Sequence, residues 1–263
     1  MRFLSAGGHR LEYNHLHPKG SPDATAEGRP TLVFLHEGLG SVAMWKKFPA
    51  NIVTATGCPV LVYSRYGYGK SDKLAQARQV DYLHREALEV LPEVLDQLGI
   101  EAPILIGHSN GASIALIHAG AGKRPVRGVV AMAPHVFVED ITVQSIAEAK
   151  TTFHSSDLAN RLGRYHDDAE STFRGWSDIW LHPEFRRWNI EEYLAGIAVP
   201  VLLIQGEDDQ YGTMAQVEAI ARQVSAPVET VMLPDCTHSP HQIQKDATIE
   251  AISGFVARLC KPD

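Results

Sequence analysis

The sequence predicts an α/β fold, a doubly wound and mostly parallel sheet with an inserted helical segment. Short apolar runs such as 31–35 and 103–106 have the continuous hydrophobicity of strands buried on both faces. Stretches with helical spacing alternate with these runs, whereas residues 135–195 show no strand pattern. We therefore expect a core formed by 1–134 and 196–263, with 135–195 as a helical cap over the carboxyl edge of the sheet.

Composition narrows the class of protein. The chain has 263 residues, of which 44% are hydrophobic and 21% charged, as in ordinary globular proteins. A formal net charge of -7 with dispersed basic residues argues against a nucleic-acid surface. Three cysteines do not form a disulfide framework, so free thiols in a reducing compartment are expected. With neither a signal peptide nor an apolar run of membrane-spanning length, we expect a cytoplasmic protein that does not bind membranes.

The first elements are a hairpin and two buried strands. Weak alternation around a Gly-Gly pair predicts a β-hairpin over 1–17, and prolines and glycines predict a loop over 18–30. The run at 31–35 predicts a central strand, followed by a helix over 43–54 and a strand over 59–63. His15 and His17 alternate on one strand face, and we interpret them as solvent-facing side chains rather than a metal pair.

A long helix and the central strands follow. The loop 64–72 ends in Gly-Lys-Ser but lacks the first glycine of a phosphate-binding loop and a helix directly after it, so we reject a nucleotide site. Helical spacing predicts a helix over 81–98, capped by Asp81 and kinked at Pro92. Further predicted elements are strands over 103–106 and 126–134, cap helices over 142–153, 155–165 and 168–180, strands over 199–204 and 227–233, and helices over 214–224 and 242–259.

One pentapeptide, Gly107-His108-Ser109-Asn110-Gly111, lies where a predicted strand ends and a buried helix begins. A turn this sharp strains the serine backbone and exposes its hydroxyl. Glycines two residues before and two after the serine allow the flanking backbone to pass close to its neighbours. The pattern therefore indicates a nucleophilic Ser109, with the Asn110 backbone N–H directed toward whatever the serine attacks.

Two further polar segments follow predicted strands. The acidic run 207–209 and His238 each come directly after one, as does Ser109. Parallel strands deliver their carboxyl ends to one edge, so these three sites can converge. A histidine removes the serine proton, and a carboxylate orients and stabilises that histidine. Gly38, in the glycine-bearing loop after the first central strand, is our second oxyanion donor, with Leu39 as the fallback.

These segments, taken together, resemble the α/β-hydrolase superfamily. The stretch 35–38 is similar to its His-Gly oxyanion loop, and 65–71 to its arginine- and glycine-rich loop. The stretch 107–111 matches its nucleophile elbow, 206–209 its acid loop and 237–240 its histidine loop. The resemblance spans almost the whole chain except the cap, and it implies an α/β-hydrolase fold with a serine nucleophile.

The resemblance also ranks the candidates for acid and base. The family acid stands three residues after the loop glycine, which selects Asp209, with Asp208 second and Glu139 or Asp140 third. The family histidine follows a short turn after the last strand, which favours His238 over His241.

One position departs from the family pattern. Glu37 stands where the family commonly has glycine, and it either braces the loop or faces the pocket. Serine rather than aspartate at 109 argues against the dehalogenase and epoxide-hydrolase branches.

We expect a serine hydrolase that cleaves a small-molecule carboxylic ester through an acyl-enzyme, without a metal or organic cofactor. Carbon–carbon hydrolysis of a ring-cleavage-type diketone is the main alternative, followed by lactonase, thioesterase and peptidase activities; a binding receptor on the same fold is the non-enzymatic one. A homodimer is one of the oligomeric states that we consider. Residues that could contact substrate are Glu37, Leu39, His241, Trp176 and Trp180, with Phe173, Arg174, Arg186 and Trp188 as further cap candidates.

Overall fold

The computed structural model describes residues 1–18 and 29–260, so most of the loop predicted over 18–30 lies outside the described residues. Eight strands form one sheet in the order β1-β2-β4-β3-β5-β6-β7-β8. The β1–β2 and β2–β4 pairs are antiparallel and every other pair is parallel. The strands are β1 (Arg2–Ala6), β2 (His9–Leu16), β3 (Leu32–Leu35), β4 (Val60–Tyr63), β5 (Ile104–His108), β6 (Gly128–Met132), β7 (Val201–Gly206) and β8 (Val228–Leu233). The prediction of a doubly wound, mostly parallel sheet is confirmed.

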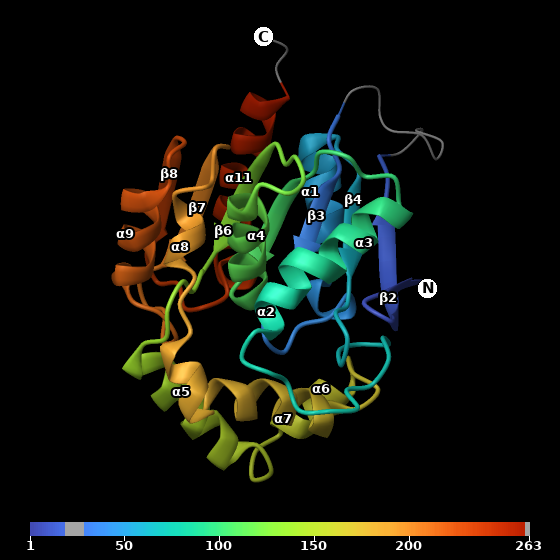
Figure 1. The fold of residues 1–263 in the computed structure, drawn as a ribbon, viewed down its shortest axis with the longest axis vertical. Helices are drawn as coiled ribbons and strands as arrows, with labels where there is room; N and C mark the ends of the chain where they lie inside the picture. Colours follow the sequence, from blue (N-terminus) through green and yellow to red (C-terminus); the bar gives the residue numbers. More distant parts are fainter. Residues whose placement is uncertain (19–28, 261–263) are drawn as a thin grey trace.

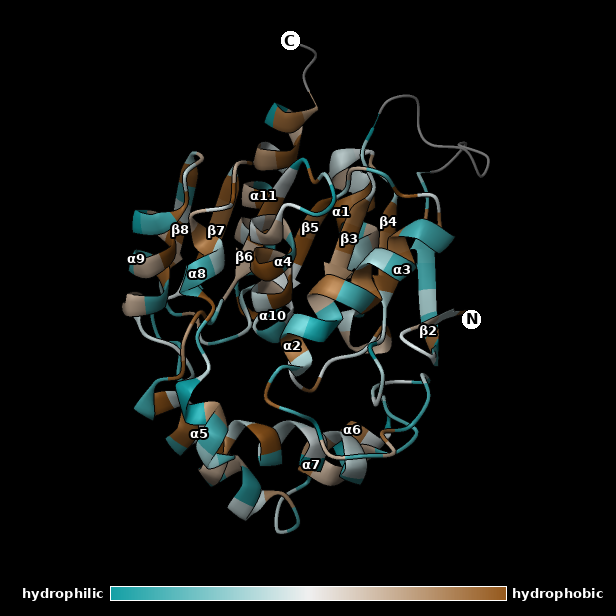
Figure 2. Cartoon of the chain, viewed as in Figure 1, coloured by the Kyte–Doolittle hydropathy of each residue, from teal (hydrophilic) through white to brown (hydrophobic). Residues whose placement is uncertain are grey.

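Helices cover both faces of this sheet (Figure 1). Alternate residues of the central strands point to opposite faces, so Val33 and Leu105 join one apolar cluster, whereas Phe34 and Ile106 join the other. The central strands are hydrophobic along their length, while β2, which pairs with the edge strand β1, is largely hydrophilic (Figure 2). The α-helices are α1 (Phe48–Thr56), α2 (Tyr82–Arg85), α3 (Leu91–Gln97), α4 (Asn110–Ala121), α5 (Asp140–Thr152), α6 (Leu158–Gly163), α7 (Ala169–Trp180), α8 (Glu191–Leu194), α9 (Met214–Gln223), α10 (Pro240–Ile243) and α11 (Lys245–Leu259).

Three predicted helices differ in detail from those observed. The helix expected over 43–54 is a 3-10 turn, η1 (Ala43–Trp45), followed by α1, because Lys46 has a positive φ of 52° that interrupts the helix. The helix expected over 81–98 contains a π-turn, η2 (Glu86–Val90), directly before the turn that holds Pro92, which has no amide proton to donate. Asp81 precedes this helix without a side-chain capping bond. The last predicted helix is divided into α10 and α11 at Gln244.

The segment between β6 and β7 lies beyond one end of the sheet (Figure 1). It contains α5, α6 and α7, then a 3-10 helix, η3 (Pro183–Arg187), and α8. Its helix α7 has a strongly apolar face that buries Phe173, Trp176 and Trp180. We call residues 135–195 the helical insert. The predicted absence of sheet in this segment holds apart from one isolated bridge between Phe137 and Asn189.

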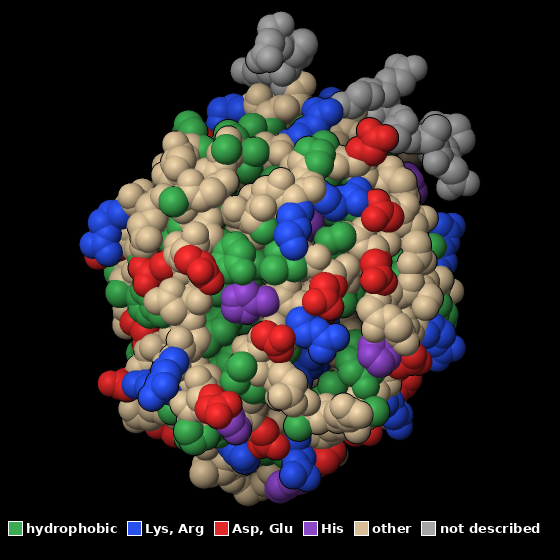
Figure 3. Space-filling model, viewed as in Figure 1, with side chains coloured by type: hydrophobic (Ala, Val, Ile, Leu, Met, Phe, Trp, Pro, Cys, Tyr) green, Lys and Arg blue, Asp and Glu red, His purple; other side chains and the backbone are tan. Residues whose placement is uncertain are grey.

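Basic and acidic side chains are interspersed on the face of the molecule seen in Figure 3. Across the described ranges, no helix combines the length and the apolar character needed to cross a membrane. Nor do three or more His, Cys, Asp or Glu side chains come together there in a way that would hold a metal ion.

Candidate active site

Ser109 occupies the sharp turn between β5 and α4. Its backbone adopts φ 53° and ψ -117°, a left-handed conformation that is strained for a residue with a side chain. The two flanking glycines permit this turn, because a Cβ at Gly111 would lie 1.9 Å from the Leu35 carbonyl oxygen and one at Gly107 would lie 2.3 Å from the Gly111 carbonyl oxygen. The serine is only 6% exposed, yet it lines a cavity between the sheet edge and the helical insert.

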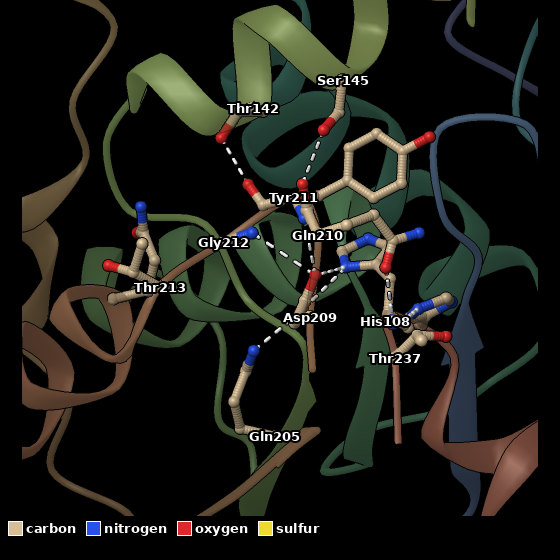
Figure 4. A network of polar contacts seen from close by, with 12 residues as sticks. His108, Thr142, Ser145, Gln205, Asp209, Gln210, Tyr211, Gly212, Thr213 and Thr237 are labelled. Atoms are coloured by element: carbon tan, nitrogen blue, oxygen red, sulfur yellow. Dashed lines mark hydrogen bonds and ion pairs between the residues drawn. The ribbon is translucent and has the colours of Figure 1, made fainter. Parts of the chain in front are cut away.

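Asp209 and His238 form a close pair beside this cavity. Nδ1 of His238 lies 2.9 Å from both carboxylate oxygens of Asp209. The carboxylate also accepts hydrogen bonds from the Gln205 side chain and from the backbone N–H groups of Tyr211 and Gly212 (Figure 4). Burial alone would raise the pKa of Asp209, but the hydrogen bond and charge of His238 lower it to about 2. The carboxylate is therefore ionised at neutral pH and holds Nδ1 as the protonated nitrogen.

The other acidic candidates are engaged elsewhere. Asp208 is exposed, and no contact links its side chain to His238 among the residues that the structure describes. Glu139 accepts hydrogen bonds from Thr213 and Gln216. Asp140 pairs with Arg186. The structure thus brings Asp209, and none of its three competitors, to the histidine.

His238 and Ser109 line the same cavity. Within the described ranges, no hydrogen bond joins the Ser109 hydroxyl to the imidazole. Catalytic hydrogen bonds are often long in an unliganded enzyme and shorten when substrate is bound.

His108 connects the elbow to the loop that carries His238. Its Nε2 donates a hydrogen bond of 2.7 Å to the backbone carbonyl of His238. Its Nδ1 lies 3.5 Å from Oε2 of Glu37 and has no hydrogen-bond partner in the described part of the chain. The sequence left open whether Glu37 braces its loop or faces the pocket. In the structure its side chain contacts His108, and it also lines the cavity. Burial opposes ionisation of Glu37, but the neighbouring His108 lowers its pKa well below the usual range.

The predicted oxyanion donors lie at the cavity wall. Gly38, Leu39 and Asn110 all line it. A Cβ at Gly38 would lie 2.3 Å from the Trp176 ring, so glycine lets the insert pack closely on this loop. The Asn110 side chain donates a 2.8 Å hydrogen bond to the Tyr82 hydroxyl, which also accepts one from Trp180 Nε1 at 3.1 Å. Trp180 is thereby linked, through Tyr82, to the residue that follows Ser109.

The cap candidates divide into two groups. Trp176 and Trp180 line the cavity, whereas Phe173, Arg174, Arg186 and Trp188 do not. His241, the remaining candidate for a substrate contact, does not line the cavity either. It is 4% exposed and packs on Trp45 and Phe48 outside the cavity lining, because α10 turns its ring toward α1.

Several lining residues were missed by the sequence analysis. Apolar side chains of the insert, Ile146, Leu158 and Leu162, line a cavity of about 370 Å³ together with His135 and Tyr211. Lys46 and Arg161 are exposed lining residues, and the described residues offer neither of them a carboxylate partner. His135 could have been found, because it follows the strand predicted over 126–134 at the same sheet edge. Arg161 had no such signal, since helical spacing does not say which face of an insert helix turns inward.

The insert is also bonded to the acid loop. Thr142 and Ser145 of α5 donate hydrogen bonds to the backbone carbonyls of Tyr211 and Gln210 (Figure 4). The cavity roof and the loop carrying Asp209 are therefore held in one arrangement.

The fold and these motifs define an α/β hydrolase, and the chain belongs to the alpha/beta hydrolase family, whose model matches residues 32–251. It is 23% identical to a proline iminopeptidase of Saccharolobus solfataricus over 87% of this chain and 85% of that protein. It is 34% identical to a 2-hydroxy-6-oxononadienedioate/2-hydroxy-6-oxononatrienedioate hydrolase of Cupriavidus pinatubonensis, over only 41% of this chain and 37% of that protein. Among solved structures it is similar in fold to the enol-lactonase from Burkholderia xenovorans, with a TM-score of 0.74, 20% identity and coverage of 97% of this chain and 100% of that one. The predicted family membership is confirmed.

Proposed function

We propose that this chain is a serine hydrolase that cleaves small-molecule carboxylic esters through an acyl-enzyme intermediate. The observation that carries the proposal is the pairing of His238 Nδ1 with both oxygens of the buried Asp209 carboxylate, at 2.9 Å. This pairing leaves Nε2 as the basic nitrogen, in a cavity that also exposes the strained Ser109.

The reaction follows from these roles. Ser109 Oγ attacks the ester carbonyl and gives its proton to His238 Nε2, while Asp209 stabilises the imidazolium that forms. The backbone N–H groups of Gly38 and Asn110 hold the oxyanion, each donor being worth about 3 kcal/mol of the barrier. His238 returns the proton to the leaving alcohol, and the acyl group remains on Ser109. A water molecule then repeats the sequence, which releases the acid and restores the serine.

The helical insert acts as the cap in this proposal. It supplies the apolar side of a cavity of about 370 Å³, a size that suits a small molecule. Trp176 and Trp180 would contact the substrate from above. The protein would work in the cytoplasm, alone or as a homodimer, without a cofactor.

Hydrolysis of a carbon–carbon bond is the second candidate. The relative from Cupriavidus pinatubonensis, 34% identical over 110 residues, is named as a hydrolase of oxo-dienedioates. The same serine, acid and histidine would serve that reaction, so substrates must separate the two. Lactonase activity stands behind it, supported by the likeness to a 3-oxoadipate enol-lactonase of Acinetobacter baylyi, 23% identical over 89% of this chain and 91% of that protein.

A fluorophosphonate probe tests the nucleophile. We expect the wild-type protein to be labelled and Ser109→Ala to remain unlabelled, with p-nitrophenyl butyrate hydrolysis reduced by about 10⁴-fold or more. Ser239→Ala is the matched control, because Ser239 lines the same cavity but lies outside the elbow, and it should be labelled normally. Labelling that survives Ser109→Ala would refute the catalytic role, and a wild-type protein that is not labelled would favour a binding receptor.

A paired assay with p-nitrophenyl esters and a vinylogous diketone tests the substrate class. Turnover of the esters supports ester hydrolysis. Turnover of the diketone alone would replace it with carbon–carbon cleavage.

A further inference from the structure

His135 is a buried polar side chain in the wall of the cavity, and none of the residues that the structure describes forms a hydrogen bond with its ring. It is 2% exposed and lines the cavity with Ser109 and His238. Its Nδ1 is buried beside Gly212 with no hydrogen-bond partner in the described part of the chain, and Nε2, the less buried ring nitrogen, has no partner there either. Such a group ordinarily finds a partner, because leaving it unpaired costs roughly 1–3 kcal/mol.

The backbone around His135 is fixed at several points. The Ser113 hydroxyl donates a 2.6 Å hydrogen bond to the His135 carbonyl, and the Val136 N–H donates one of 2.7 Å to the Gln216 side chain. The preceding Ala133 has a positive φ of 46° and bonds to Ile204 of β7. The backbone that carries the ring is consequently fixed before any substrate arrives.

The ring lies next to the reacting groups. Its centroid is 5.7 Å from that of His238 and 5.3 Å from that of Trp180, against which it packs edge-on. His135 therefore lies beside the proposed base, in the wall of the same cavity that Ser109 lines.

The charge state of His135 narrows the chemistry of its partner. Burial lowers the pKa of His135 to about 3, so the imidazole is neutral at neutral pH. A neutral imidazole offers one N–H donor and one lone pair. It suits a hydroxyl or a keto oxygen, whereas a carboxylate would be better matched by Lys46 or Arg161.

We propose that His135 is a specificity-determining residue that hydrogen-bonds a neutral oxygen substituent, a hydroxyl or an oxo group, of the substrate near its scissile carbonyl. The inference rests on the proposed ester hydrolysis and narrows its substrates to oxygenated esters. A site built to bond such a group discriminates strongly against the analogue that lacks it, because the buried partner is then left unpaired.

Matched ester pairs test this, with acid release followed in a pH-stat. Methyl butyrate is compared with its 2-hydroxy, 3-hydroxy and 3-oxo derivatives, and ethyl butyrate with 2-hydroxyethyl butyrate, so that both sides of the ester are sampled. For the wild type we expect at least one oxygenated ester to exceed its parent about tenfold in kcat/KM. His135→Phe should bring that ratio close to one and change the parent's kcat/KM less than about threefold, and His135→Gln should keep part of the preference.

Thr142→Val is the control variant. Thr142 lines the same cavity, but its hydroxyl already donates to the Tyr211 carbonyl. Loss of this hydroxyl should change kcat/KM by the same factor for the parent ester and for its oxygenated derivative. A thermal unfolding scan of each variant confirms that it is folded.

The outcomes separate the two proposals. Turnover of the parent esters with no preference for any oxygenated one, or a preference that survives His135→Phe, overturns the role of His135 and leaves ester hydrolysis standing. If His135→Phe lowers kcat/KM by the same factor for all of the esters, the residue is structural, which also overturns its role in specificity. A wild-type protein that hydrolyses none of the esters contradicts both proposals.

Discussion

The two walls of the cavity differ in chemistry and in how they are built. The sheet-side wall carries the polar groups Ser109, Asn110, His135 and His238, each placed at or just past the end of a strand and fixed by backbone contacts. The insert-side wall is formed mainly by apolar and aromatic side chains of α5, α6 and α7. In the proposed function, the polar groups at the sheet edge carry out the reaction, and the insert sets the size and shape of the substrate.

The sheet-side wall should be the more sensitive to small changes. Asp209→Asn removes the carboxylate that holds His238 Nδ1, and we expect kcat to fall by about 10³–10⁴-fold while the fold is kept. Steady-state kinetics with p-nitrophenyl butyrate measure this. Asp208→Asn, one residue away and exposed, should change kcat less than about twofold, and a comparable loss in that variant would contradict the assignment.

The close backbone packing around the turn at Ser109 should tolerate substitution equally poorly. A Cβ at Gly111 would lie 1.9 Å from the Leu35 carbonyl oxygen, so we expect Gly111→Ala to lower the free energy of unfolding by about 3 kcal/mol or more. Urea denaturation measures the loss. Gly254→Ala in α11 is the control, because the nearest atom to its Cβ would lie 3.6 Å away, and it should be neutral or slightly stabilising. Equal stability of the two variants would refute the steric account.

Burial of His135 predicts a pH dependence of stability. The pKa of His135 is about 3 in the folded protein and near 6.5 in the unfolded chain, so the unfolded state binds the proton first as the pH falls. Its contribution to stability is present above about pH 6.5 and is lost progressively as the pH falls to about 3, by about 2–4 kcal/mol. Urea unfolding of wild type and His135→Phe at several pH values isolates this part as a difference curve. A flat difference curve would show that His135 is not the titrating group.

The insert-side wall should tolerate substitution and respond in substrate preference instead. Ile146 of α5 is buried and lines the cavity, so a larger side chain there should shorten the acyl chain that fits. We expect Ile146→Phe to lower kcat/KM for p-nitrophenyl hexanoate by about tenfold relative to p-nitrophenyl acetate. Ile141→Phe on the same helix is the control, because Ile141 is exposed outside the cavity lining. If the acyl preference of Ile146→Phe matched that of wild type, the acyl group would not lie against the insert.

The sequence by itself determined the sheet, the elbow and the identity of the family. These depend on local signals, namely continuous apolar runs for buried strands, glycines at a strained turn, and polar residues directly after strands. Because parallel strands bring their carboxyl ends to the same edge of a sheet, residues that follow different strands lie close together. For this reason Ser109, Asp209 and His238 could be predicted as a group.

Only the tertiary structure decided which residues form the rest of the cavity. Glu37 reaches His108, His241 turns toward Trp45, and Arg161 rather than Arg174 or Arg186 lines the cavity. Each outcome depends on the rotation of a short helix or the path of a loop. Helical spacing indicates that one face of a helix is apolar, but what that face packs against is fixed by contacts between segments far apart in the chain.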